Sequence, residues 1–181
     1  MKIHIFVFIL LVEACSNPQN SETVNVNTSP AMTDVSSVSN TEKLLTKIMG
    51  KDGLVRGVQF GDDIAEVKKK EGSAAFEEDD KHIGFSFDTE NLETVDIIYQ
   101  KDKNNRVKGI ELSIYMNTNA SNDSLKSAMS AYFTNKFGNP LPKSDNLAWG
   151  LKPAGKVSIK VVQNKLDRGL EVKFTKDSDI Q

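Results

Sequence analysis

Apolar side chains recur after residue 40 of the chain with two different spacings. Spacings of three and four residues, which place side chains on one helical face, predict helices at residues 41–49, 62–72 and 123–137. Alternation of apolar and polar residues between turn residues predicts strands at residues 54–60, 83–87, 95–99, 107–116, 147–151, 156–163 and 170–176. This order predicts an α+β fold, in which about two or three helices cover an antiparallel sheet of about six to eight strands.

Capping residues give the expected ends of these helices. Asp63 and Glu66 have the spacing of a capping box, and Gly72 is expected to end the helix that they begin. Ser121 or Asp123 is expected to cap the last helix. The apolar stripe of that helix consists of Leu125, Ala128, Met129, Tyr132, Phe133 and Phe137. So wide a stripe makes this helix the best candidate to cover the sheet.

The two halves of this region have the same order of elements. A helix that ends in a glycine precedes a group of strands in each half, at residues 62–72 and at residues 123–138. We therefore expect a single α+β domain at residues 41–181. The shared order is compatible with a degenerate tandem repeat, but residue identity between the halves is too thin to establish one from the sequence.

The first forty residues differ from the domain in composition. Lys2 precedes an apolar run of about ten residues, which is too short to span a hydrocarbon core of about 30 Å and fits a secretory leader. Residues 16–40 are mostly small and polar and contain no Lys or Arg. We expect residues 1–14 to be a signal peptide and residues 15–40 to be a flexible tether.

Val12-Glu13-Ala14-Cys15 resembles the lipobox of bacterial lipoproteins. In that family the cysteine thiol receives diacylglycerol, and the leader is removed before it. The resemblance implies lipid attachment at Cys15, with acyl chains such as palmitate holding the protein firmly to a membrane. Cys15 is the only cysteine in the chain, and lipidation explains why an exported protein keeps a single thiol.

The lipobox implies the bacterial cell envelope as the location. Ser16-Asn17 contain no acidic run of the kind that resembles surface-export signals. We therefore expect an outer-membrane anchor with the domain facing the periplasm.

The charge distribution excludes one class of partner. The formal net charge is -2, from 23 basic and 25 acidic residues that are interspersed through the domain. Because no broad positive field is present, we expect no nucleic-acid partner. Two local runs, Lys68–Lys70 and Glu77–Asp80, are interpreted as a solvated helix end and an acidic loop.

The domain offers few residues for metal or hydrolytic chemistry. Its single histidine, His82, is interpreted as a surface residue, and the domain has no cysteine. These residues cannot form a His/Cys zinc or copper site within one chain, and no nucleophile elbow or phosphate loop is present. We therefore expect no cofactor, no metal and no catalytic residue. Paired carboxylates remain open, because they need only closeness in space.

Two aromatic residues leave a binding role open. Trp149 is in phase with Leu147 and Leu151 on its strand, so we expect it in the core. Tyr132 lies on the apolar stripe of the last helix and has the same expected place. The alternative is that Trp149 or Tyr132 forms a stacking platform for a small molecule or glycan.

The segment from Val58 to Gly72, VQFGDDIAEVKKKEG, resembles the opening of small envelope domains of the SmpA/OmlA and beta-lactamase-inhibitor-like type. In those families a glycine precedes a short helix, a valine lies on its buried face, a glycine closes it and strands follow. The resemblance implies helices packed on an antiparallel sheet that serves protein contacts, and it carries over no catalytic residues.

Three functions follow as hypotheses. The first is a non-enzymatic lipoprotein that binds another envelope protein. The second is a lipoprotein that binds a small molecule or glycan, and the third is a hydrolase that depends on carboxylates alone.

Overall fold

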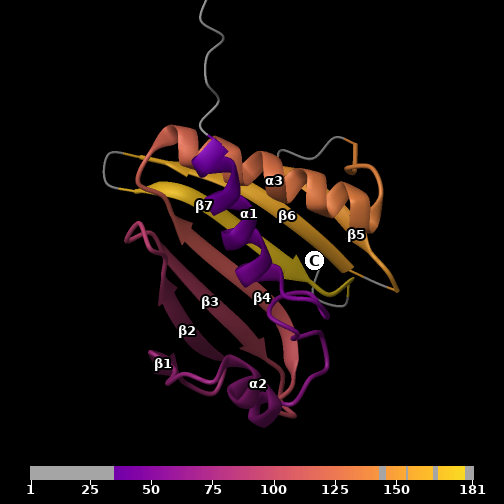
Figure 1. Ribbon diagram of the computed structural model, residues 1–181. Helices are drawn as coiled ribbons and strands as arrows, with labels where there is room; N and C mark the ends of the chain where they lie inside the picture. The colour runs from indigo at the N-terminus through magenta and orange to yellow at the C-terminus, as the bar shows by residue number, and fades with distance from the viewer. Residues whose placement is uncertain (1–34, 143–145, 154, 165–166, 178–181) are drawn as a thin grey trace, which may run out of the picture. The chain divides into compact units, whose positions relative to one another are not determined.

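The computed structural model describes residues 35–142, 146–153, 155–164 and 167–177. The predicted signal peptide, Cys15 and most of the predicted tether lie outside these residues. The described part contains three helices and one seven-stranded antiparallel sheet (Figure 1). The predicted α+β fold is therefore confirmed.

Most elements occur where the apolar pattern predicts them. The helices are α1 (Val35–Met49), α2 (Ile64–Glu71) and α3 (Asn119–Phe137). The strands are β1 (Glu77–Glu78), β2 (His82–Asp88), β3 (Thr94–Lys101), β4 (Val107–Tyr115), β5 (Leu147–Leu151), β6 (Gly155–Gln163) and β7 (Arg168–Thr175). Helix α1 begins six residues before the expected domain start at residue 41.

The sheet consists of two meanders joined at its centre. The strand order is β1-β2-β3-β4-β7-β6-β5, and every neighbouring pair is antiparallel. Strands β4 and β7, the last strands of their meanders, pair with Leu112 opposite Val172. The expected order of a helix followed by a strand meander in each half is confirmed. A common origin of the two halves stays a prediction.

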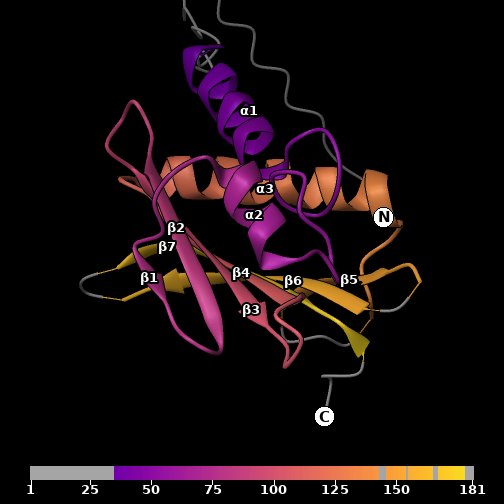
Figure 2. The same ribbon diagram turned by 90° about the horizontal axis from the view of Figure 1, so that it is seen from below.

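All three helices lie on one face of the sheet (Figure 2). Alternation directs apolar residues of every long strand to that face, including Ile97, Leu112 and Val172, none more than 1% exposed. The opposite face carries ion pairs between neighbouring strands, such as Lys173 Nζ to Glu111 Oε2 at 3.1 Å. One face of the sheet is thus packed against the helices, and the other is mainly polar.

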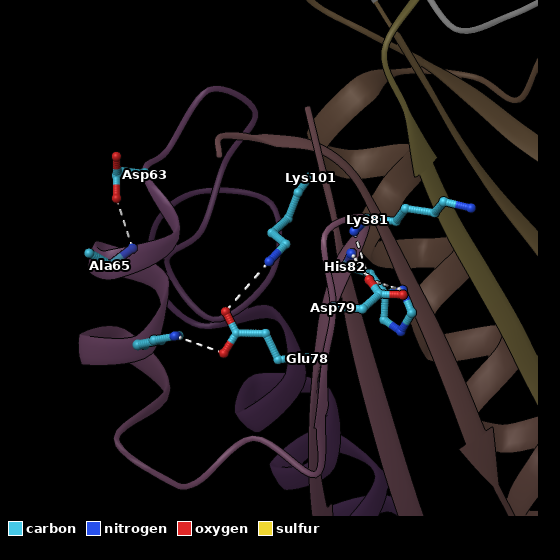
Figure 3. Close-up of polar contacts among 8 residues, drawn as sticks. Asp63, Ala65, Glu78, Asp79, Lys81, His82 and Lys101 are labelled. Carbon is cyan, nitrogen blue, oxygen red and sulfur yellow. Dashed lines mark hydrogen bonds and ion pairs between the residues drawn. The ribbon is translucent and has the colours of Figure 1, made fainter. Parts of the chain in front are cut away.

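The predicted ends of α2 at Asp63 and Gly72 are confirmed, whereas the Glu66 carboxylate of the expected capping box accepts from Lys69 Nζ at 2.6 Å. The Asp63 carboxylate accepts a hydrogen bond from the Ala65 backbone amide at 2.8 Å (Figure 3). Gly72 ends the helix with φ of 67°, a left-handed conformation that glycine adopts without strain. Ile64 and Val67 lie on its buried face.

The predicted cap of α3 is wrong. Thr118 caps the helix instead of Ser121 or Asp123, because its backbone is extended and its Oγ1 accepts from the Ser121 amide at 3.0 Å. Helix α3 therefore gains one more turn at its start. That turn places Asn122 on the buried face.

The predicted strand at residues 54–60 is also wrong. Gly53, Arg56, Gly57 and Gly61 all have positive φ, so the chain turns back every few residues. The only pairing described within this segment is a single bridge between Val55 and Val58. Alternation of apolar residues here reflects two buried valines in a tight loop, and not an extended strand.

Candidate functional site

A cleft of about 560 Å³ lies between α1, the β2–β3 hairpin tip and the start of α3. Leu44 and Lys47 of α1 form one wall, and Ser121 and Ser124 of α3 contribute another. Hairpin residues and Met116, which follows β4, complete the lining. The volume lies in the range of about 300 to 1,000 Å³ that is usual for small-ligand pockets.

Leu92 occupies the hairpin tip beside this cleft. Its side chain is 82% exposed and its backbone has a φ of 59°, which is uncommon for a residue with a bulky side chain. The turn is fixed by hydrogen bonds from the Thr89 amide to the Glu93 carbonyl at 2.8 Å and from the Leu92 amide to the Thr89 carbonyl at 3.1 Å. The Thr89 hydroxyl accepts from the amides of Asn91 and Glu93. The turn therefore holds Leu92 in solvent despite the strain.

Glu93 is the buried carboxylate of the cleft wall. The residue is 6% exposed, and it lines the cleft. Its Oε1 accepts from the Asn117 amide at 3.4 Å, and its Oε2 accepts from the Thr89 hydroxyl at 3.5 Å. Both bonds lie at the long limit of hydrogen-bond geometry. Asn117 also donates from Nδ2 to the Asn91 carbonyl at 2.5 Å, which ties the hairpin tip to the start of α3.

A cation–π contact supports the wall that α1 provides. The Lys47 Nζ lies 3.9 Å from the centre of the Phe87 ring, and the Arg56 guanidinium lies 5.3 Å from the same centre. Lys47 Nζ also donates to the Asp88 carbonyl at 3.5 Å. The Lys47 ammonium is thus engaged by the hairpin, which helps to hold α1 against it.

A buried polar cluster ties the 50–61 loop to α2 and β3. The Arg56 Nε lies 2.8 Å from Glu71 Oε2, and the Tyr99 hydroxyl donates to Glu71 Oε1. Burial, followed by the Glu71 charge, raises the pKa of Tyr99 far above its usual value. The phenol therefore stays protonated as the hydrogen-bond donor. Because these groups satisfy one another away from the cleft, we assign them to the stability of the fold.

The two charged runs of the sequence meet in space. Lys68 Nζ lies 2.8 Å from Glu78 Oε2, and the buried Lys101 lies 3.5 Å from Glu78 Oε1 (Figure 3). The hydrogen bond from Lys68 is the main reason that the pKa of Glu78 is below its usual value. The helix end and the acidic loop are thus both partly exposed, and an ion pair joins them.

His82 is more enclosed than the sequence indicates. Its side chain is 25% exposed, with Nε2 3.1 Å from Glu77 Oε1 and Nδ1 3.1 Å from Asp79 Oδ1. Asp79 also accepts from the amides of Lys81 and His82, which hold its pKa below the usual value (Figure 3). The two carboxylates contact opposite ring nitrogens, and no metal-holding group of three or more acidic, histidine or cysteine residues occurs in the described part.

The aromatic residues considered for stacking serve the core. Trp149 is fully buried, and its Nε1 donates to the Thr134 hydroxyl at 3.2 Å. The expected core position of Trp149 is confirmed, and its full burial removes the support for a stacking role. Tyr132 is half-buried, and its hydroxyl accepts from Lys136 Nζ at 3.0 Å. Lys136 also donates to the Gly53 carbonyl, so it links the Tyr132 hydroxyl to the 50–61 loop. A stacking role for Tyr132 stays a prediction.

Leu92 and Glu93 were not singled out by the sequence. A leucine inside Thr89-Glu90-Asn91-Leu92-Glu93-Thr94, an otherwise polar turn segment, was the available signal. Burial of Glu93 depends on Asn117, which lies 24 residues away and is brought near only by the fold.

The fold and the cleft define a class of α+β domain with helices on one face of an antiparallel sheet and a ligand-sized cleft among the helices and a hairpin tip. None of the helices in the described ranges is sufficiently long and apolar to cross a membrane. Comparisons with protein-family models, curated proteins and solved structures give no match.

Proposed function

We propose that this protein is a lipid-anchored envelope protein whose domain binds another envelope protein at Leu92 and the adjoining cleft. The observation that carries the proposal is the large apolar side chain of Leu92, held in solvent by a fixed and strained turn. Strained conformations of this kind cost about 1–3 kcal/mol and are concentrated at functional positions.

The geometry favours binding over catalysis. Leu92 is prominent, and its backbone is fixed before a partner arrives, which lowers the entropy cost of binding. The Thr89 hydroxyl of the hairpin is used in hydrogen bonds that fix the turn, and Asn117, which precedes α3, donates to the Asn91 carbonyl of that turn. A rigid apolar anchor beside a cleft suits recognition of a protein surface.

Replacing Leu92 by aspartate is expected to abolish partner capture while leaving the fold intact. A photo-crosslinking amino acid at position 92 should yield one discrete protein adduct in intact cells. Tagged chains carrying Leu92→Asp should then lose that protein by at least about tenfold in pull-downs, in line with loss of a central anchor. Leu141→Asp is the matched control, because Leu141 is 43% exposed at a different part of the surface. Equal loss in both variants, or no adduct at position 92, would count against the proposal.

Replacing Cys15 by serine is expected to release the protein from the membrane. Serine cannot form the thioether to diacylglycerol, so labelled palmitate should no longer enter the protein and it should move to the soluble fraction. Fractionation of cells with and without the substitution measures both changes. Full membrane association of Cys15→Ser would contradict lipid anchoring.

Small-molecule binding is the second candidate, and the cleft volume of about 560 Å³ favours it. Native mass spectrometry of the protein purified from its own cells distinguishes small-molecule binding from protein binding. A stoichiometric small adduct that is lost in a variant of the cleft wall, without a crosslinked protein at position 92, would favour this second function.

A further inference from the structure

Glu93 is buried in the cleft wall without a cationic partner among the described residues. It is 6% exposed, and no lysine, arginine or histidine nitrogen of the described residues lies within ion-pair distance of its carboxylate. A buried carboxylate is normally paired with a cation or held by several short hydrogen bonds. Within the described ranges, the Glu93 carboxylate accepts two hydrogen bonds, at 3.4 and 3.5 Å. It therefore has capacity for a stronger partner.

The cleft has room for that partner and a favourable charge. Asp88, Glu90 and Glu93 line it against two lysines, Lys43 and Lys47, so acids outnumber bases by three to two. Lys47 is already committed to the Phe87 ring and the Asp88 carbonyl. The local field around Glu93 thus favours a cation that comes from outside the domain.

The apolar part of the lining fits the stem of a basic side chain. Leu44 is 7% exposed and Met116 is 7% exposed, and both line the same cleft as Glu93. A lysine or arginine could lay its methylene groups along these two residues and carry its charged end to the carboxylate. Leu92, outside the cleft, would contact the surface from which that side chain projects.

We propose that the cleft receives a lysine or arginine side chain of the partner protein and that Glu93 is the residue that pairs with it. This inference rests on the proposed function and specifies the chemistry of the partner. The pair forms inside a partly enclosed site, where a charge-assisted hydrogen bond is stronger than at an exposed surface.

The test is a selection of peptides on the full-length chain in detergent micelles. A random library of displayed heptapeptides is selected against the wild-type protein and against Glu93→Gln. Glutamine keeps an oxygen that can accept from the Asn117 amide but removes the charge, so the turn is expected to remain folded. We expect lysine or arginine to be enriched at one position with the wild-type protein and not with Glu93→Gln.

Calorimetry then measures how much the basic side chain contributes to the affinity of the peptide. The best selected peptide and its counterpart with norleucine at the enriched position are titrated into wild-type protein. Loss of one partner of an enclosed charge pair is expected to weaken binding by about 30-fold or more. Glu111→Gln is the matched control, because it removes the same charge from the opposite, polar face of the sheet, outside the cleft, and it should change the affinity by less than about threefold.

The outcomes distinguish failure of the Glu93 pairing from failure of the proposed Leu92 interface. Selected peptides without a basic position, or basic peptides that bind Glu93→Gln equally well, overturn the pairing but leave the Leu92 interface standing. Absence of any selected peptide also overturns the pairing. The proposed function fails separately, if position 92 yields no protein adduct in cells.

Discussion

Replacing Trp149 by alanine is expected to lower the free energy of unfolding by about 4 kcal/mol. The Trp149 ring is fully buried, and its centre lies 5.3 Å from the centre of the Phe133 ring. The centre of the Phe133 ring lies 5.8 Å from that of Phe174. Alanine would leave a large cavity between α3 and the sheet, and the Thr134 hydroxyl would lose the indole donor. Chemical denaturation followed by circular dichroism measures the change.

Trp149→Phe is the control for this prediction. Phenylalanine retains most of the apolar contact and loses the hydrogen bond and part of the volume, so the expected loss is about 1–2 kcal/mol. An alanine variant as stable as the wild-type protein would show that the ring is not part of the core. It would also reopen the possibility that Trp149 contacts a ligand.

Replacing Glu71 by alanine is expected to lower the free energy of unfolding by about 3 kcal/mol. The Glu71 side chain is 2% exposed, so its loss strands the Arg56 charge and leaves the buried Tyr99 hydroxyl without its acceptor. The Arg56 side chain is 22% exposed, and water reduces the penalty for its unpaired charge. Urea denaturation of the variant gives the difference.

Two further variants make the Glu71 prediction specific. Glu66→Ala removes another α2 carboxylate, one that forms only an exposed pair with Lys69, and should change stability by less than about 0.5 kcal/mol. Tyr99→Phe in the Glu71→Ala background should recover part of the loss, because it removes the orphaned hydroxyl. No recovery would mean that the hydroxyl finds water or another acceptor.

The sequence predicted those elements whose signals are local. Alternation located β2 to β4 and β5 to β7, and Asp63 and Gly72 marked the ends of α2, because strands and caps depend on neighbouring residues. Residues 54–60 were misassigned because their apolar spacing resembles a strand. The positive φ of Arg56 depends on contacts of the folded loop, such as the hydrogen bond that its backbone amide donates to the Ile48 carbonyl.

The candidate site was largely beyond prediction from the sequence. The cleft joins α1 to the hairpin tip and to α3, which are far apart in the chain, and no repeated motif connects them. By sequence, Trp149 and Tyr132 fit either a core or a binding site, because large aromatic residues serve both. The sequence pattern favoured the core, and the packing around Phe133 agrees with it.

The central pairing of β4 with β7 has a consequence for how the chain acquires its structure. Strand β7, the last one in the described chain, lies between β4 and β6, so the two meanders have no direct connection in the sheet until it is in place. Leu112 and Val172 meet at this seam across 60 residues of sequence, and such distant contacts form late and slowly. A chain threaded unfolded through an export channel would therefore complete its hydrophobic layer only after Arg168–Thr175 had emerged. The last strand of the described chain thus decides when the domain closes, because no other strand joins the two halves of the sheet.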